Sequence, residues 1–213
     1  AYGGANMGYL AHMIAMEEIS RASASVGLSY GAHSNLCVNQ IKRNGSDAQR
    51  RKYLPKLISG EHVGALAMSE PGAGSDVISM KLKAQDKGDH YLLNGAKMWI
   101  SNSPFADLAI VLAKAENTEG RIHGLIVERG MEGFTTPTTH GKLSLRASPT
   151  GELVFDNVKV PKANLLPNKN GLGAPMGCLD SARYGIAWGT LGVAMECYDT
   201  ALRYSKQRVQ FGK

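Results

Sequence analysis

The feature that most constrains this chain is its long C-terminal stretch without proline. From Met176 to Lys213 no proline occurs, and small or apolar residues recur at helical spacing: Leu179, Ala182, Ile186, Ala187, Leu191 and Ala194. This spacing predicts one long helix with a face of small residues. Such a face needs other helices to cover it. We therefore expect the chain to be a piece of a longer polypeptide.

The first part of the chain also has helical spacing. Apolar residues predict one helix over residues 8–24 and a second over about 26–43. Ser46 and Gln49 then have the spacing of a capping box, which predicts a third helix running toward residues 59–60.

The apolar period changes to that of strands from Gly64 onward. Residues 80–85 alternate between apolar and polar, and turn signals follow at 86–89 and at Asn94-Gly95. Further short apolar runs cover residues 108–113, 124–127 and 153–160. These runs predict an antiparallel β-barrel or sandwich.

The three patterns together predict an α+β, multidomain chain. We expect residues 1–62 to be the end of an N-terminal helical domain and residues 63–166 to be the middle β-domain. Residues 172–213 would be the first helix of a C-terminal helical bundle.

Composition excludes several functional classes. The chain has 213 residues, a net charge of +6 and 43% hydrophobic residues, without an apolar run long enough for a membrane span or a secretory signal. Its three cysteines are far apart, which gives neither a disulfide framework nor a metal-binding pair and favours an intracellular setting. The basic residues between 42 and 56 lack interleaved aromatic residues, so we expect no nucleic-acid partner.

A glycine-containing stretch at residues 66–76, LAMSEPGAGSD, is the most informative motif. Glycine permits positive φ and lets a ligand approach the main chain closely, so phosphate or a flavin edge could bind there. The stretch lacks the third glycine and the following helix of a dinucleotide-binding fingerprint. Taken alone, it would more often be a plain turn.

Three other stretches carry candidate ligand-binding groups. Trp99 and Ser101 place an indole beside a hydroxyl near the end of a predicted strand, although a strand Trp is usually a core residue. Asp180 and Arg183 share a helix face, and an ion pair between them is the simplest explanation. Arg208 could bind a diphosphate, or could be an ordinary surface arginine.

These four stretches, in this order and at these separations, resemble the acyl-CoA dehydrogenases, and the resemblance covers essentially the whole chain. It implies FAD as cofactor, an acyl-CoA as substrate and an oxidoreductase that introduces an α,β double bond. It also implies a homotetramer when the chain is complete and an electron-transfer flavoprotein as partner.

Site residues follow from the resemblance position by position. The expected FAD contacts are Leu66, Ala67, Met68, Ser69, Gly74, Ser75, Trp99, Ile100, Ser101 and Arg208, the last reaching the FAD of a neighbouring subunit. The expected substrate contacts are Leu28, Ala32, Ser75, Asp180 and Arg183. No metal ligand is expected.

The N-terminal half is most similar to isovaleryl-CoA dehydrogenases and the C-terminal part to glutaryl-CoA dehydrogenases. The position that matches the carboxylate-binding arginine of the glutaryl group is Gly27, which favours an apolar acyl chain. The position that matches the catalytic glutamate of the isovaleryl group is Ala182, which cannot accept a proton. We therefore expect no catalytic base in this chain and a glutamate beyond Lys213. Glu70, beside the glycine stretch, is expected to hold backbone rather than to remove a proton.

The preferred interpretation is FAD-dependent dehydrogenation of a short, branched, isovaleryl-like acyl-CoA, with this chain alone inactive. One alternative is a non-catalytic module that binds FAD or acyl-CoA, and another is glutaryl-CoA dehydrogenase-like activity. The expected compartment is the mitochondrial matrix or a bacterial cytoplasm.

Overall fold

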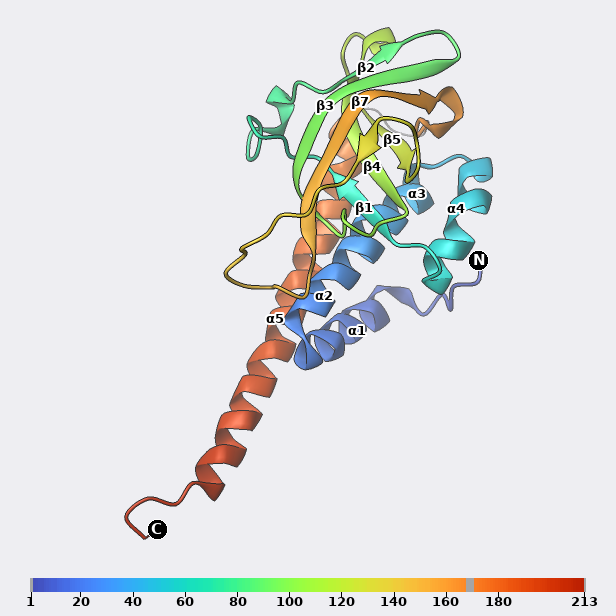
Figure 1. The fold of residues 1–213 in the computed structure, drawn as a ribbon. Coiled ribbons are helices and arrows are strands. Elements are labelled where there is room, and N and C mark those ends of the chain that lie inside the picture. The colour runs from blue at the N-terminus through green and yellow to red at the C-terminus, as the bar shows by residue number, and fades with distance from the viewer. Residues whose placement is uncertain (1, 168–170, 213) are drawn as a thin grey trace.

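The computed structural model describes residues 2–167 and 171–212, which form a group of helices, a curled sheet and one long helix (Figure 1). The α-helices are α1 (Gly8–Ala22), α2 (Ala24–Gly31), α3 (Asn39–Asn44), α4 (Asp47–Ser59) and α5 (Gly173–Gln207). A π-helical segment, Ala32–Val38, joins α2 to α3 without a break. The N-terminal helices and the long C-terminal helix are therefore confirmed, although the π-helical segment was not predicted.

The capping box that begins α4 is present. The Gln49 backbone N–H donates to Ser46 Oγ at 3.2 Å, and the Ser46 backbone N–H donates to Gln49 Oε1 at 2.9 Å. Gln49 Nε2 also donates to the carbonyl oxygens of Ala163 and Leu165 at 2.7 and 2.8 Å. The residue that caps α4 thus also attaches this helix to the β-domain.

The middle of the chain forms a seven-stranded sheet. Its strands are β1 (Gly64–Ala67), β2 (Lys83–Asp86), β3 (His90–Ser101), β4 (Leu108–Ala115), β5 (Ile122–Glu128), β6 (Phe134–Thr135) and β7 (Thr150–Pro161). Their order is β1-β4-β2-β3-β7-β6, and β5 pairs with β4. The sequence predicted an antiparallel β-barrel or sandwich here, and the middle domain is a curled sheet (Figure 1). The sheet is mixed, however, because β1 and β2 each pair with β4 in parallel.

The predicted turn at Asn94-Gly95 is wrong. Strand β3 continues through both residues, and only a register shift against β7 between Leu93 and Gly95 marks the position. Gly95 has φ +141°, and Asn94 exchanges hydrogen bonds with Asn157 of β7 at 2.8 and 3.2 Å. Asn94 and Gly95 therefore form a bulge in β3, and the positive φ of Gly95 is one that glycine adopts readily.

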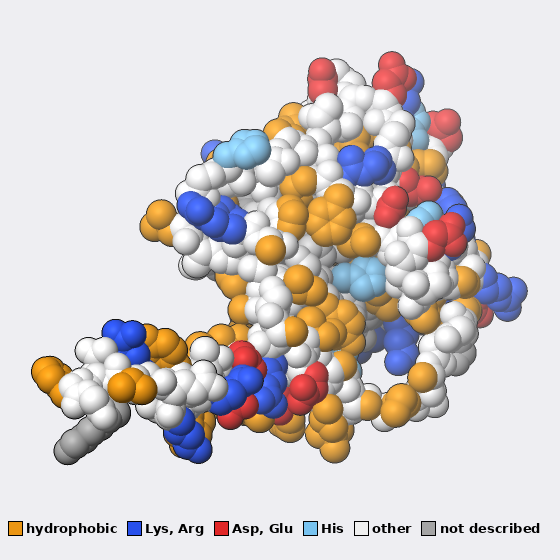
Figure 2. Space-filling model, turned by 60° about the horizontal axis from the view of Figure 1, so that its bottom comes forward, with side chains coloured by type: hydrophobic (Ala, Val, Ile, Leu, Met, Phe, Trp, Pro, Cys, Tyr) orange, Lys and Arg blue, Asp and Glu red, His pale blue; other side chains and the backbone are white. Residues whose placement is uncertain are grey.

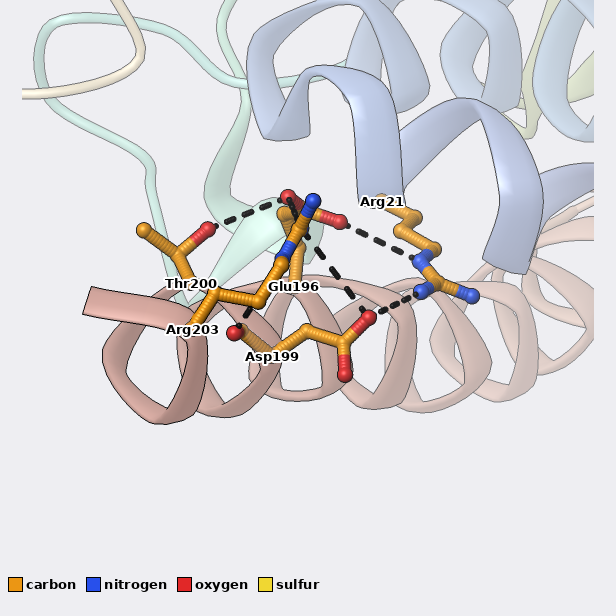
Figure 3. Close-up of polar contacts among 5 residues, drawn as sticks. All are labelled: Arg21, Glu196, Asp199, Thr200 and Arg203. Carbon is orange, nitrogen blue, oxygen red and sulfur yellow. Dashed lines mark hydrogen bonds and ion pairs between the residues drawn. The ribbon is translucent and has the colours of Figure 1, made fainter. Parts of the chain in front are cut away.

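Helix α5 packs closely against α1 through buried glycines. Gly185, Gly189 and Gly192 face α1, and a Cβ at Gly192 would lie 2.1 Å from the carbonyl oxygen of Glu17. At the end of α1, Arg21 bonds to Glu196 and Asp199 of α5 at 3.3 and 3.0 Å (Figure 3). The glycines thus let the backbones of α1 and α5 approach closely. Further along α5, the ion pairs of Arg21 continue the contact between the two helices.

The C-terminal part of α5 extends away from the rest of the structure (Figure 1). Hydrophobic side chains lie along this projecting part (Figure 2), and Leu191, Met195, Tyr198 and Leu202 are exposed. This exposure agrees with the expectation that the helix needs partners to cover it. No described helix combines the length and apolar composition that crossing a bilayer requires.

Candidate functional site

The glycine stretch forms a solvent-exposed loop with a tight turn directly after β1. Glu70 and Ala73 exchange backbone hydrogen bonds of 2.9 and 3.1 Å, which close the turn between them. Gly72 inside this turn and Gly74 and Ser75 after it are exposed, and a Cβ at either glycine would meet no atom within 4 Å. The main chain of this loop is therefore open to a ligand.

A buried ion pair holds this loop against β3. Lys97 Nζ donates to Glu70 Oε1 at 2.9 Å and to the carbonyl oxygen of Met68 at 3.0 Å. The Glu70 carboxylate also accepts the backbone N–H groups of Lys81 and Leu82 at 2.7 and 3.1 Å. The Lys97 side chain is 0% exposed, and a buried charge is costly unless it is paired. The ion pair with Glu70 supplies that compensation inside the protein.

These contacts shift the pKa values of both partners. Burial would raise the pKa of Glu70, but the hydrogen bonds from Lys81 and Lys97 and the charge of Lys97 outweigh it and lower the pKa. Burial lowers the pKa of Lys97, and Glu70 opposes that shift. Glu70 therefore stays ionised, and its bonds to two backbone N–H groups confirm the expectation that it holds backbone.

Trp99 lies in a bulge of β3 beside the glycine loop. The pairing of β3 with β7 shifts register between Lys97 and Ile100, and Trp99 has φ +62° and is 63% exposed. The Met98 backbone N–H donates to the Ser69 carbonyl oxygen at 2.9 Å. The structure thus brings the two predicted flavin-binding stretches together, with the indole outward, Ile100 buried and Ser101 half-buried.

Leu28 lies at a small apolar cavity between α1, α2 and α5. The cavity has a volume of about 170 Å³ and is lined by Met16, Ser20, Ala24, Leu28, Leu145, Ile186, Gly189, Thr190 and Val193. Ala32, one turn beyond Leu28, is buried and is not part of this lining. The structure therefore places one of the two predicted acyl-chain residues at a cavity.

The remaining predicted site residues lie on or beyond α5. Asp180 and Arg183 form an exposed ion pair of 3.0 Å on its surface. Arg208 directly follows α5 and is exposed, and the C-terminal part of α5 projects from the rest of the structure (Figure 1). Arg208 is therefore not brought to the glycine loop of its own chain.

Sequence reasoning missed the residues that connect α2 to the β-domain. Asn102 has φ +68°, and its side-chain Nδ2 donates to the Ser29 carbonyl oxygen at 2.9 Å. Ser29 Oγ and Ser148 Oγ lie 2.8 Å apart. These contacts join residues far apart in the sequence, so no local pattern predicts them. The one available signal was that asparagine, the residue type at position 102, adopts positive φ more readily than most others.

The described residues contain no group of three or more His, Cys, Asp or Glu side chains arranged to hold a metal ion. The groups that could bind a cofactor are instead backbone, hydroxyl and indole groups. An exposed aromatic plane beside an open glycine loop suits a flat heteroaromatic ligand.

Three family models match consecutive parts of the chain. They are the N-terminal domain of acyl-CoA dehydrogenase over residues 1–61, its middle domain over 65–158 and its C-terminal domain over 169–213.

Known relatives match over the full length of the chain. Isovaleryl-CoA dehydrogenase of Pongo abelii is 55% identical and that of Solanum tuberosum 56%, with 100% of this chain aligned to 51% and 52% of theirs. A crystal structure of a glutaryl-CoA dehydrogenase from Mycobacterium smegmatis in complex with FADH2 superposes with a TM-score of 0.95 at 37% identity, over 100% of this chain and 54% of that one. The chain thus spans about half the length of the curated relatives it matches, and it belongs to the acyl-CoA dehydrogenase family.

Proposed function

We propose that the chain carries most of the FAD and acyl-CoA contacts of an acyl-CoA dehydrogenase for short, branched acyl chains. The observation that supports this most is the joining of the glycine loop to the Trp99 bulge by the Ser69–Met98 hydrogen bond. The names of the isovaleryl-CoA dehydrogenase relatives and the FADH2 complex of the Mycobacterium smegmatis enzyme point the same way.

The residues present suit FAD. The exposed Trp99 indole offers a plane for the isoalloxazine, and the open backbone at Gly74 allows close approach. Ser69 and Ser101 would supply hydroxyl groups to the ring, with Leu66, Ala67, Met68 and Ile100 beside it. FAD, when bound, supplies the two-electron acceptor for α,β-dehydrogenation of a CoA thioester.

The substrate would lie along α5. Asp180 and Arg183 would contact the CoA moiety, Ser75 would touch the substrate beside the flavin, and Leu28 and Ala32 would shape the acyl site. The cavity at Leu28 is small and lined by uncharged residues, which suits a short apolar chain. We do not favour a dicarboxylic substrate, because the lining offers no counter-charge and Gly27 is buried against Ser20.

This chain supplies no base to remove the α-proton in the proposal. Glu70 is held by Lys97 and by two backbone N–H groups, so it is not free to move toward a substrate. Ala182 presents only a methyl group. The base would be a glutamate beyond Lys213, and the chain alone would act as a binding module rather than as an enzyme.

The assembly and partners of the whole protein are part of the same proposal. Arg208 would reach the FAD of a neighbouring subunit in a homotetramer, and electrons would leave through an electron-transfer flavoprotein. Mitochondrial names among the relatives favour the mitochondrial matrix, with a bacterial cytoplasm as the alternative. The domains would divide at residues 1–62, 63–166 and 172–213.

A flavin titration of the purified chain tests the proposal. We expect a structured visible flavin band and quenching of Trp99 fluorescence when FAD is added, and weaker binding by the Trp99→Ala variant. Trp188→Phe, which alters the other, half-buried tryptophan on α5, serves as the control. Absence of FAD binding by the wild-type chain, also after addition of a separately produced C-terminal part, would contradict the proposal, as would turnover of isovaleryl-CoA by the chain alone at about 1 per second or more.

A further inference from the structure

The cavity at Leu28 has one lining residue that no helix provides. Eight of its nine lining residues belong to α1, α2 or α5, and the ninth is Leu145. Leu145 lies in the long connection between β6 and β7, residues 136–149, which reaches across to the helices (Figure 1). The β-domain therefore contributes one side chain to a cavity that is otherwise helical.

Leu145 has an unusual backbone conformation for its residue type. Its φ is +50°, in the left-handed region that branched side chains rarely adopt. Non-glycine residues held in this region are strained and persist only where their surroundings enforce them. The position of Leu145 is therefore imposed by its neighbours rather than by its own backbone preference.

The hydrogen bonds that enforce this position centre on Ser148. The Ser148 backbone N–H donates to the Leu145 carbonyl oxygen at 3.0 Å, and the buried Ser148 hydroxyl lies 2.8 Å from Ser29 Oγ on α2. Lys142 Nζ donates to the Ser148 carbonyl oxygen at 2.6 Å, and Arg146 Nε donates to the Lys142 carbonyl oxygen at 2.8 Å. The loop is thus attached to α2 directly beside the cavity.

Exposure separates Leu145 from the other leucine of this loop. Leu145 is 39% exposed, whereas Leu143 is 96% exposed and lines no part of the cavity. The loop therefore carries two leucines of the same size, of which only one covers the cavity. This difference provides a matched control.

The order of residues along α5 relates the cavity to the proposed CoA contacts. Asp180 and Arg183 come first, and Ile186, Thr190 and Val193 line the cavity further along. At a rise of about 1.5 Å per residue, Thr190 lies roughly 10 Å from Arg183 along the helix. Thr190 Oγ1 already donates to the Ala187 carbonyl oxygen at 2.7 Å, so the cavity offers mainly apolar contacts.

We propose that Leu145 is a specificity-determining residue, which closes the outer wall of the acyl cavity and limits it to short or branched acyl chains. This inference rests on the proposed function. Ser29 and Ser148 act as positioning residues, because they hold the backbone that carries Leu145.

Calorimetric binding of isovaleryl-CoA and octanoyl-CoA to the FAD-loaded chain tests the inference. Leu145→Ala removes the wall, so we expect the affinity ratio of octanoyl-CoA to isovaleryl-CoA to rise about tenfold or more, since one methylene in an apolar pocket is worth about 10-fold to 200-fold. Leu145→Phe fills the cavity and should weaken isovaleryl-CoA binding by a similar factor. Leu143→Ala should leave the ratio unchanged.

The outcomes separate the inference from the proposed function. If the wild-type chain binds neither ester, the proposed function fails and the inference falls with it. If the wild-type chain binds isovaleryl-CoA but Leu145→Ala and Leu143→Ala give the same ratio, only the inference is overturned. Should Leu145→Ala not fold, Leu145→Phe still decides the test. An unchanged affinity of Leu145→Phe for isovaleryl-CoA would also overturn the inference.

Discussion

Lys97 Nζ lies 2.9 Å from Glu70 Oε1, and the lysine side chain is completely buried. The two residues belong to different segments, the loop after β1 and the middle of β3, so their ion pair, together with the Ser69–Met98 hydrogen bond, holds the glycine loop against the Trp99 bulge. A buried pair of this kind is a weak source of net stability, yet removal of one partner leaves the other charge uncompensated. The pair therefore makes the geometry of the proposed flavin site sensitive to single substitutions.

The variant Lys97→Met should be strongly destabilised. Breaking a buried pair costs about 3–5 kcal/mol, and the double variant Glu70→Gln/Lys97→Met should recover much of that loss because neither charge remains. Urea unfolding of the three proteins measures both values. Lys52→Met is a suitable control, since its pair with Glu128 is 2.8 Å long but has 58% and 36% exposed side chains, and its loss should cost about 1 kcal/mol or less. Equal losses for Lys97→Met and Lys52→Met would argue against a buried charged pair.

The lowered pKa of Glu70 predicts a pH dependence of stability. Because this pKa is lower in the folded chain than in the unfolded one, ionised Glu70 stabilises the fold at pH above about 4.3, the ordinary glutamate value. That contribution is lost as the pH falls through the folded pKa. The free energy of unfolding of the wild-type chain should therefore decrease more steeply below about pH 4.3 than that of Glu70→Gln. Parallel curves for the two proteins in acid would contradict this assignment.

Close packing of α5 against α1 predicts opposite effects of two glycine substitutions on one helix. Gly192→Ala would place Cβ 2.1 Å from the Glu17 carbonyl oxygen, a backbone atom, so we expect a loss of about 1–3 kcal/mol. Gly177→Ala meets only the end of the Arg43 side chain at 3.4 Å, and alanine should stabilise the helix by up to about 1 kcal/mol. Thermal unfolding distinguishes the two signs, and destabilisation of both variants alike would refute the packing argument.

The sequence predicted the local elements better than their pairing. The Ser46–Gln49 capping box and the long helix could be predicted because the interactions that determine them lie within a few residues. Asn94-Gly95 was misread because its two-residue signal suits either a turn or a bulge, and Asn157 of β7 selects the bulge. The parallel pairings of β4 depend on strands far apart in the chain, which no local pattern specifies.

The candidate site was predictable in the same limited sense. Trp99 and the glycine stretch could be singled out by residue type, and their resemblance to a family suggested a shared ligand. The Lys97–Glu70 pair could not be predicted, because the residue type of a strand lysine does not show whether the fold buries it. Leu145 was missed for a similar reason, since its role depends on a loop crossing to helices distant in sequence.

The burial of Gly27 makes a last prediction, which concerns dicarboxylic substrates. A Cβ at this position would lie 2.1 Å from Ser20 Oγ and 3.0 Å from Ser20 Cβ on α1, so even a small side chain at residue 27 must move the Ser20 side chain, and a large one must also push on α1. Gly27→Arg should therefore unfold the chain at lower urea concentration, by an equivalent of about 1–3 kcal/mol or more, instead of creating a site for glutaryl-CoA. Because Ser20 is the obstacle, the variant Ser20→Gly/Gly27→Ala should be more stable than Gly27→Ala alone. A stable Gly27→Arg protein that binds glutaryl-CoA in calorimetry would show that this face of α2 opens toward the substrate, contrary to the packing described.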